Sequence, residues 1–331
     1  MNHFPVSKSI LSDSALADFI QKQYALGDKI RCRLIKTWVN DTYLITANNT
    51  NYIFRVYTLN WRTEKEIQEE IRLIALLKQK ELPVSFAIRD SNGNYIQQLS
   101  APEGLRFAVL FSFAEGEKFH NLSRETHFEM GIIMAKIHQQ THNLELDRIH
   151  YTAEVLLKDS FTQIQSLFTT DCEEYQFLSS LQKTLLEEFE KVDSPNIRKG
   201  VVHLDIWADN AAFNKANEIT IFDFDFCGNG WLCYDIAFYS SMLFATEQDE
   251  KERSSKMEHF MNGYQSITPI SGEELRLIPV LATSLQFFYL GIQCQRFSAV
   301  FVNEFHIKRF INLRLKSLYQ WTIPTNSPAI I

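Results

Sequence analysis

Glycine is scarce in this sequence, which has 11 glycines among 331 residues, against 26 phenylalanines. The phosphate-loop pattern G-x-x-x-x-G-K-[ST], the dinucleotide-binding pattern G-x-G-x-x-G and the nucleophile pattern G-x-S-x-G are all missing. Their absence argues against a P-loop NTPase, a Rossmann-type enzyme and a serine hydrolase with a nucleophile elbow. The five cysteines are scattered without a C-x-x-C pair, which indicates free thiols rather than disulfides or a zinc site.

An excess of positive charge and a long apolar run are missing too. The net charge is −7, so a nucleic-acid partner has no electrostatic support. The N-terminus lacks a basic region followed by an apolar stretch, and we find no run long enough to span a bilayer. We therefore expect no nucleic-acid partner, no membrane partner and a cytoplasmic location. The length is sufficient for two lobes.

The most informative stretch is the polar motif at residues 201–239. It opens with the pattern H-x-D-x-x-x-x-N, formed by His203, Asp205 and Asn210. The apolar run 219–222 is β-branched and aromatic, which predicts a buried strand. Asp223 follows this run directly, so we expect it where the strand leaves the core, a common place for a residue that contacts a ligand.

Two carboxylates and an amide in this order suit phosphoryl transfer, which requires mainly positioning and charge stabilisation from the protein. In the kinase arrangement, a loop Asp faces the attacking hydroxyl. An Asn five residues later and a strand-end Asp hold magnesium against the nucleotide phosphates. Asp205, Asn210 and Asp223 have the corresponding residue types, order and spacing.

This motif resembles the aminoglycoside phosphotransferase and choline kinase family, which includes homoserine kinase type II and bacterial stress-response kinase-like members. The family pattern is H-G-D-x-x-x-x-N followed by I-D-F-x-x-x-G-x-G-x-x-x-Y-D. In this sequence the second half reads Phe222-Asp223-Phe224, followed at the family spacing by Gly228, Gly230, Tyr234 and Asp235. Leu204 stands where the family usually has glycine. Because leucine favours an ordinary backbone conformation, we expect the loop to run differently there.

The resemblance implies an α+β, bilobal protein-kinase-like fold. Its parts would be an N-terminal antiparallel-sheet lobe with one main helix (1–110), a hinge (111–116) and a larger, mostly helical lobe for catalysis and substrate binding (117–331). Hydrophobic periodicity and turn residues predict strands at 31–38, 43–47, 52–57, 84–89, 95–98, 106–111 and 219–222. They predict helices at 13–26, 61–80, 123–142, 153–168, 173–192, 234–243, 254–264, 273–296 and 302–319, with Asp13 and Ser14 as the first cap.

The same resemblance implies roles for individual residues. Asp205 would accept or orient the proton of the hydroxyl, and Asn210 and Asp223 would hold Mg²⁺. Arg55 takes the place of the phosphate-binding lysine. Its planar fork binds phosphate, but arginine is not a neutral replacement for lysine. Glu70 lies at the position of the acid that orients this basic residue.

Further positions are expected near ATP. Asn40 belongs to a turn, 36–43, that resembles the phosphate-covering turn of the family, although it contains no glycine. Phe111 and Phe113 lie in the hinge, where backbone groups would meet the adenine edge. ATP and Mg²⁺ are thus the expected cofactors. Three polar residues are expected to be structural: His203 and Asp235, which hold the loop, and His138, a core residue of the predicted helix 123–142.

Other interpretations stay open. Four acids could bind metal ions in a hydrolase, and 223–225 mimics the D-x-D of aspartate-nucleophile phosphatases; the four are Asp205, Asp209, Asp223 and Asp225. Leu204 and Arg55 would suit a nucleotide-binding, non-catalytic pseudokinase. A bacterial Ser/Thr protein kinase of the stress-response type would share the catalytic loop.

The helical half contains an aromatic cluster at 285–289 and 296–297. Such a cluster could hold a cationic or planar substrate, although an aromatic stripe on a helix is more often part of the core. We predict an ATP- and Mg²⁺-dependent O-phosphotransferase that acts on a hydroxyl of a small molecule. An amino alcohol, a homoserine-like metabolite and an aminoglycoside-type drug all remain candidate acceptors.

Overall fold

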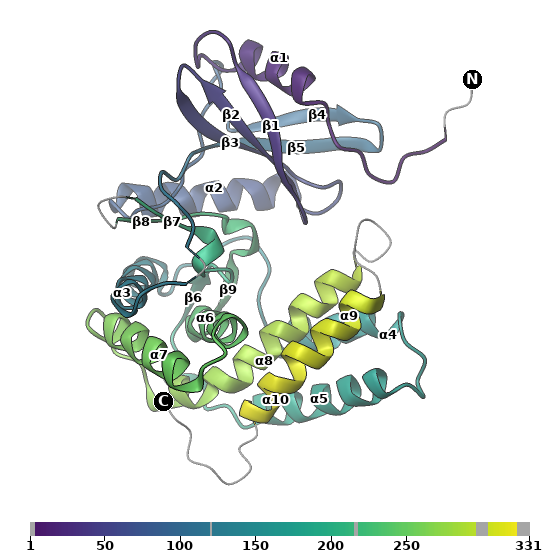
Figure 1. Cartoon of the computed structure of the whole chain (residues 1–331), viewed down its shortest axis with the longest axis vertical. Coiled ribbons are helices and arrows are strands. Elements are labelled where there is room, and N and C mark those ends of the chain that lie inside the picture. Colours follow the sequence, from purple (N-terminus) through teal and green to yellow (C-terminus); the bar gives the residue numbers. More distant parts are fainter. Residues whose placement is uncertain (1–3, 120, 215–217, 296–303, 323–331) are drawn as a thin grey trace. The chain divides into compact units, whose positions relative to one another are not determined.

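The computed structural model describes residues 4–119, 121–214, 218–295 and 304–322 (Figure 1). The chain divides into two compact units. The sheet unit comprises Met1–Glu117 and Ala211–Asp225, and the helical unit comprises Lys118–Asn210 and Phe226–Ile331. Sequence patterns did not indicate that residues 211–225 pack with the N-terminal part of the chain.

The sheet unit is built on an antiparallel sheet with the strand order β1-β2-β3-β5-β4. The turn between β2 and β3 uses Asn48 and Asn49, whose φ angles are 48° and 65°. Asparagine tolerates this left-handed conformation, which suits a tight hairpin. The strands are β1 (Arg31–Thr37), β2 (Asp41–Ala47), β3 (Thr50–Val56), β4 (Ile96–Ala101) and β5 (Gly104–Ser112).

Five of the six strands predicted in this region are present, with ends shifted by a few residues. The prediction of a strand at 84–89 is wrong. Val84 and Ala87 make only isolated bridges, to Ile221 and Phe111. The segment therefore touches two different strands one residue at a time and follows neither of them.

Helix α1 (Asp13–Gln23) covers one face of the sheet. Its N-cap is Ser12, whose hydroxyl accepts from the Ala15 amide, and not the predicted Asp13 or Ser14. Buried apolar residues of α1 and of alternate strand positions form the core on this face: Leu16, Ile20, Tyr24, Tyr43, Ile45, Phe54, Val56, Leu99, Ala108 and Leu110.

Helix α2 (Glu64–Gln79) begins with a capping box in which Thr63 and Glu66 satisfy each other's backbone amides. Its predicted apolar face is buried as expected: Ile67, Ile71, Ile74 and Leu77. Glu70 is also fully buried. A buried carboxylate needs a partner, because transferring an unpaired charge from water into the protein is costly.

Residues 211–225 contribute a short hairpin to the sheet unit. Its strands are β7 (Ala211–Phe213) and β8 (Ile219–Ile221). Ile221 bridges to Val84, and Phe213 bridges to Glu117. The buried strand predicted at 219–222 is therefore present as β8. Asp223, which follows the predicted range directly, begins the polar segment of the motif.

The helical unit contains the remaining elements. The helices are α3 (Arg124–Thr141), α4 (Ser160–Gln165), α5 (Glu173–Glu190), α6 (Cys233–Thr246), α7 (Glu250–Gln265), α8 (Gly272–Gln295), α9 (Glu304–Phe310) and α10 (Lys316–Thr322), with π-helical turns η1 (Glu154–Asp159) and η5 (Ile311–Leu315). Strands β6 (Lys199–Val202) and β9 (Gly228–Trp231) pair with each other. The predicted helices are present; the first residues of the one predicted at 302–319 lie outside the described residues.

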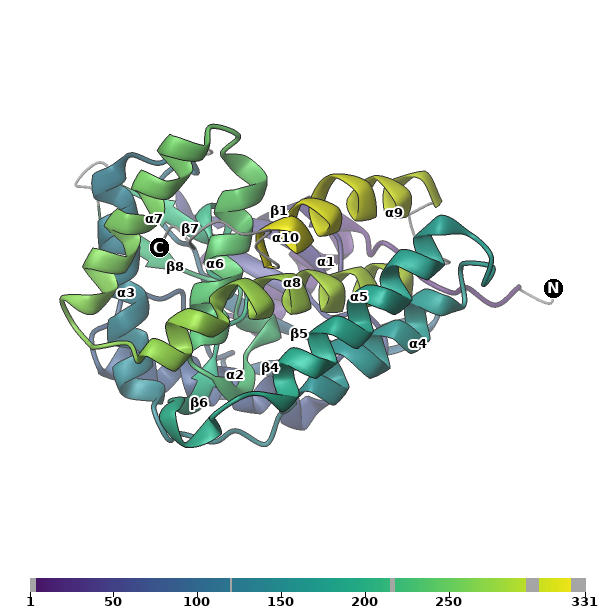
Figure 2. The same ribbon diagram turned by 90° about the horizontal axis from the view of Figure 1, so that it is seen from below.

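Helices α3 and α7 lie side by side (Figure 2) and approach closely at two glycines. A Cβ atom on Gly131 would come within 2.1 Å of the Phe260 carbonyl oxygen, and one on Gly263 within 2.0 Å of the Phe128 carbonyl oxygen. Any larger residue would push the helices apart. Gly131 thus permits the close contact of two helices.

Helix α8 is long and apolar enough to cross a membrane by composition, with a mean hydropathy of 1.5 over its most apolar window. However, 72% of that window is buried inside the protein, as in the core helix of a globular unit. Phe287 and Phe288 are buried. The aromatic stripe at 285–289 is thus largely core, and residues 296–297 lie outside the described residues.

Candidate active site

Arg55 is the centre of a polar cluster in the sheet unit. It lies on β3, the middle strand, and alternation along the strand turns it to the face opposite Phe54. Its Nη1 donates to Glu70 Oε1 at 2.7 Å, and its Nη2 donates to Asp223 Oδ1 at 2.7 Å. The structure thus brings three of the predicted site residues together through one guanidinium.

Burial makes this cluster electrostatically strong. The Arg55 side chain is 8% exposed, and its guanidinium carbon lies 4.9 Å from the centroid of the Phe111 ring. Burial by itself lowers the pKa of Arg55, but the charges of Asp223 and Glu70 outweigh it and hold that pKa above its usual value. The guanidinium therefore stays charged at every physiological pH.

Asp223 has an unusual backbone conformation, with a φ of 68° in the left-handed region. This region costs a residue with a Cβ atom about 1–2 kcal/mol. Its side chain is 32% exposed, and Oδ2 takes no part in the bond to Arg55. A strained and partly exposed carboxylate beside a fixed cation is typical of a functional position.

The loop that carries the H-x-D pattern lies in the helical unit and contains a second strained residue. We expected Leu204 to keep an ordinary backbone conformation, and this is wrong, because its φ is 66°. Its amide donates to Asp235 Oδ1 at 2.6 Å, and its carbonyl oxygen accepts from the Tyr289 hydroxyl at 2.9 Å. These two bonds and a fully buried side chain offset the strain. Leucine here adopts the conformation that glycine favours.

Asp235 holds this loop from within the core. Its Oδ2 accepts from the His203 amide at 3.0 Å and lies 3.0 Å from His138 Nε2. His138 Nδ1 lies 2.7 Å from the Tyr264 hydroxyl, and the Asp205 amide donates to His203 Nδ1 at 3.2 Å. The predicted contacts of His203 and Asp235 in the loop are present, and His138 is buried in the core as expected.

Asp205 and Asn210 are brought together by this loop. Asn210 lies at the end of a 3₁₀ turn, Ala208–Asn210, and its side-chain nitrogen donates to Asp205 Oδ2 at 2.7 Å and to the Asp205 carbonyl at 3.0 Å. The Asn210 side-chain oxygen takes no part in these bonds. The pair therefore combines an oriented, half-buried carboxylate with a carboxamide oxygen.

Comparison with protein families identifies the wider group. The model of the phosphotransferase enzyme family (APH) matches residues 32–270, more than half of the chain. The chain belongs to the phosphotransferase enzyme family. This membership confirms the resemblance drawn from the motif, and it makes the protein an enzyme that transfers a phosphoryl group to an alcohol.

Individual proteins to which the chain is similar agree with this assignment. The chain is similar to the homoserine kinase of Paramagnetospirillum magneticum, with 25% identity over 282 residues that cover 82% of each chain. It is similar in structure to an amicoumacin kinase in complex with AMP-PNP, Ca²⁺ and Ami (TM-score 0.78, 18% identity, 96% of each chain). It is also similar to a microcompartment-associated aminopropanol kinase (TM-score 0.75, 20% identity, 92% of this chain and 95% of that one). These structures confirm the protein-kinase-like fold.

Sequence reasoning missed the part that Asp225 plays in this phosphotransferase. Its carboxylate is almost fully buried and accepts from Trp61 Nε1 at 2.8 Å and from Asn40 Nδ2 at 3.1 Å. Arg62 Nε donates to the same carboxylate at 3.2 Å, and Arg62 Nη2 donates to the Asp225 carbonyl at 2.8 Å. Asp225 thus ties the segment after β8 to the residues before α2. The adjacent pair Trp61-Arg62, which offers several hydrogen-bond donors, was the feature of the sequence that could have pointed to a buried acidic partner.

The remaining predicted residues of the family site are found on the sheet unit. Asn40 is buried, and its side chain links Asp225 to the Thr58 amide. Phe111 is buried in β5 beneath Arg55, and Phe113 follows the end of that strand. Asn40 and Phe111 therefore contribute side chains to the framework of the site, while the predicted contacts of their backbones with ATP stay predictions.

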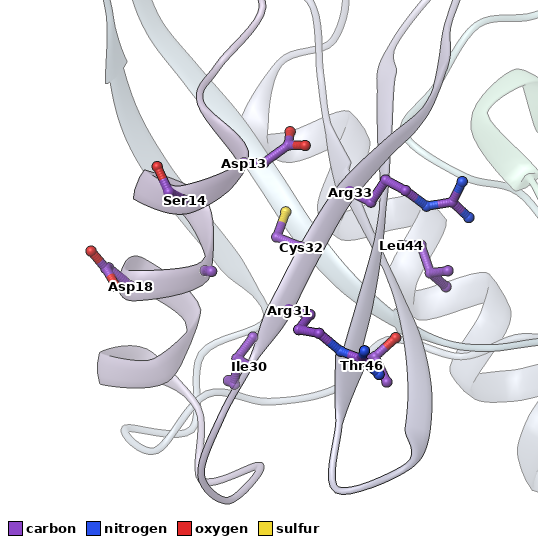
Figure 3. Close-up of a pocket in the computed structure, with 10 residues that line it drawn as sticks. Asp13, Ser14, Asp18, Ile30, Arg31, Cys32, Arg33, Leu44 and Thr46 are labelled. Atoms are coloured by element: carbon purple, nitrogen blue, oxygen red, sulfur yellow. The ribbon is translucent and has the colours of Figure 1, made fainter.

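A separate surface pocket of about 690 Å³ lies between α1 and β1 (Figure 3). Asp13 and Asp18 line it from the helix, and Arg31 and Arg33 line it from the strand. Burial, and then the charge of Asp13, raise the pKa of Cys32 in this pocket to about 12. The thiol therefore stays protonated at neutral pH and is a poor nucleophile. The predicted site residues do not line this pocket.

Proposed function

We propose that this enzyme is an ATP- and Mg²⁺-dependent kinase that phosphorylates a hydroxyl group of a small molecule in the cytoplasm. One observation carries the proposal: Arg55 holds Asp223 in a strained, partly exposed conformation with one carboxylate oxygen outside the ion pair. Strain of this kind persists where the surrounding structure enforces it. An exposed carboxylate fixed in this way suits a metal-bound polyphosphate.

The oxygen donors of the motif fit magnesium. Mg²⁺ is usually bound by one or two carboxylates together with waters and substrate phosphates, rather than by an all-protein cage. Asp223 and Asn210 are the residues that would hold it, through a carboxylate and a carboxamide oxygen. Across the parts of the chain that the structure describes, no group of three or more His, Cys, Asp or Glu side chains could hold a metal ion. When bound, Mg²⁺ would neutralise charge on the phosphates.

Asp205 is the proposed base. A bond forms between the acceptor oxygen and the γ-phosphorus of ATP, and the bond from that phosphorus to the β,γ-bridging oxygen breaks, which releases ADP. Asp205 accepts the proton of the hydroxyl and returns it to solvent. Asn210 fixes the orientation of Asp205 Oδ2 through the bond of 2.7 Å.

Arg55 and the residues around it are proposed to bind the nucleotide. The guanidinium would contact the phosphates while Glu70 keeps it in place, as an acid paired with a basic strand residue does in kinases. Backbone groups of the turn around Asn40 would cover the phosphates, and those of Phe111 and Phe113 would meet the adenine. The permanent charge of Arg55 supports this role, because phosphate recognition requires a cation at every working pH.

A small-molecule acceptor is favoured over a protein acceptor. The similar proteins are named for homoserine, amicoumacin and aminopropanol, all of which are small molecules. A non-catalytic pseudokinase is disfavoured, because the base and both proposed metal-binding residues are present and oriented by hydrogen bonds.

Thermal unfolding with and without ATP and MgCl₂ tests the nucleotide site. A ligand that binds only the folded state raises the midpoint of unfolding by mass action. We expect the midpoint of unfolding of the wild type to rise in a magnesium-dependent way, and Asp223→Ala to lose this rise. We also expect the wild type to release ADP from ATP when a hydroxylated acceptor is present. No rise for the wild type at saturating ATP and magnesium would contradict the proposal and favour the non-catalytic alternative.

A further inference from the structure

Arg314 is a cation in the helical unit that the proposed chemistry does not use. It lies in the π-helical turn η5, which joins α9 to α10. This run of helix packs along α8 (Figure 2). A π-helical turn inserts one residue into the helix and is often found at functional sites, because it redirects a side chain.

The Arg314 guanidinium is mostly buried and incompletely satisfied. Its Nη2 contacts the sulfur of Met242, and its carbon lies 5.6 Å from the centroid of the Phe310 ring. Its Nε is buried without a hydrogen-bond partner. Among the described residues, no carboxylate lies within ion-pair distance of it. A buried guanidinium with an unmade hydrogen bond is costly, so its retention needs an explanation.

A chain of contacts connects Arg314 to the loop of the proposed base. Met242 and Phe238 are four residues apart on α6, so they lie on the same face one turn apart. The Phe238 ring lies 5.3 Å from that of Tyr289, whose hydroxyl donates to the Leu204 carbonyl. Leu204 directly precedes Asp205. Arg314 is therefore connected to the loop of the proposed base through residues of α6 and α8.

The electrostatic environment agrees with this placement. Burial lowers the pKa of Arg314 to about 10, and Tyr289 and Asp205 oppose that decrease. Asp205 is thus close enough for its charge to act on the guanidinium. At neutral pH Arg314 stays charged, because a pKa of about 10 lies well above 7.

We propose that Arg314 binds a carboxylate of the acceptor, so that the substrate is a small hydroxylated carboxylic acid. This inference rests on the proposed function. Within the described residues the Arg314 guanidinium has no carboxylate partner, and arginine recognises a carboxylate through charge-assisted hydrogen bonds. A substrate anion beside Asp205 would otherwise meet like-charge repulsion, and Arg314 offsets it. An amino alcohol or another cationic acceptor would instead face an unmatched positive charge.

Paired acceptors that differ only in charge test the proposal. The probes are L-homoserine and L-homoserine amide, and 4-hydroxybutanoate and 4-hydroxybutanamide, each measured for turnover by ADP release and for binding by calorimetry. The proteins are wild type, Arg314→Gln, Arg314→Lys and the matched control Arg309→Gln, which replaces an exposed arginine of α9. Circular dichroism verifies the fold of each, and Arg314→Lys keeps the test usable if Arg314→Gln fails to fold.

We expect wild type and Arg309→Gln to prefer each acid over its amide by about tenfold or more, the size of a charge-assisted hydrogen bond. Arg314→Gln should lose this preference, and Arg314→Lys should retain part of it. If the Arg314 variants lost turnover and binding of acid and amide equally, Arg314 would act on Asp205 or on the stability of the fold. That result would overturn the proposal. Turnover of amino alcohols without use of the acids would also overturn it while leaving the proposed kinase activity intact. If nothing were phosphorylated, Arg314-dependent binding of the acids would still support it, and its absence would contradict it.

Discussion

Arg55 donates to Asp223 at 2.7 Å although the two residues lie 168 positions apart in the chain. The same guanidinium donates to Glu70, so one side chain links the middle strand, the main helix and the end of β8. The arginine that replaces the lysine expected at this position therefore orients the proposed metal-binding carboxylate as well. A lysine ammonium is a point charge and would not present the same two-pronged geometry.

Replacement of Arg55 should affect stability as well as activity. Arg55→Met leaves Glu70 buried without its cation, and breaking a buried pair in this way costs about 3–5 kcal/mol. We expect urea denaturation to show a loss of this order, partly recovered in the double variant Arg55→Met/Glu70→Met. Arg72→Met is the control, because the Arg72–Glu69 pair is exposed at its arginine. A stability of Arg55→Met equal to that of wild type would contradict the importance of the cluster.

Replacement of the proposed base should separate binding from catalysis. Asp205→Asn keeps the shape of the side chain but cannot accept the proton, and general-base groups contribute about 10²–10⁴-fold to rate. We expect the turnover number to fall by this factor while the dissociation constant for ATP stays within a few fold. Asp209→Asn, in the same loop, serves as the control. Unchanged turnover on an authentic acceptor would remove Asp205 from its proposed role.

Leu204 allows a test of backbone strain. At most helical or extended positions glycine is less stable than alanine by about 0.5–1 kcal/mol. Because φ at Leu204 is 66°, we expect the opposite order, with Leu204→Gly more stable than Leu204→Ala by about 1 kcal/mol. Both variants lose the buried side chain, so their difference isolates the backbone. Chemical denaturation of the two variants measures this difference in stability. If Leu204→Ala were the more stable variant, the backbone strain at this position would be absent.

The contact between α3 and α7 should be sensitive to a single methyl group. Gly131→Ala would place a Cβ atom 2.1 Å from the Phe260 carbonyl oxygen, so the helices must separate. We expect a loss of about 1–3 kcal/mol, typical of overpacking. Gly272→Ala is the matched control, because nothing lies within 4 Å of its Cβ position at the start of α8. Thermal unfolding that showed equal stability for both variants would be inconsistent with the close contact.

The local sequence was sufficient for most of the fold. Apolar periodicity predicted α2 and α3, and periodicity with turn residues predicted β1, β2 and β3, because these signals act over a few neighbouring residues. The segment 84–89 was mistaken for a strand because pairing depends on a partner elsewhere in the chain. The motif around Asp205 predicted the family, since its residue types and spacing reflect one chemistry.

The sequence by itself therefore determined most of the elements, the family and the candidate catalytic residues. Only the tertiary structure decided how several of these residues are held. Leu204 takes a positive φ because Asp235, 31 residues later, accepts its amide hydrogen. Asp225 is buried because Trp61 and Arg62 satisfy it from across the sheet unit. Long-range hydrogen bonds of this kind outweigh local backbone preferences, since they combine with the burial of the groups that they join.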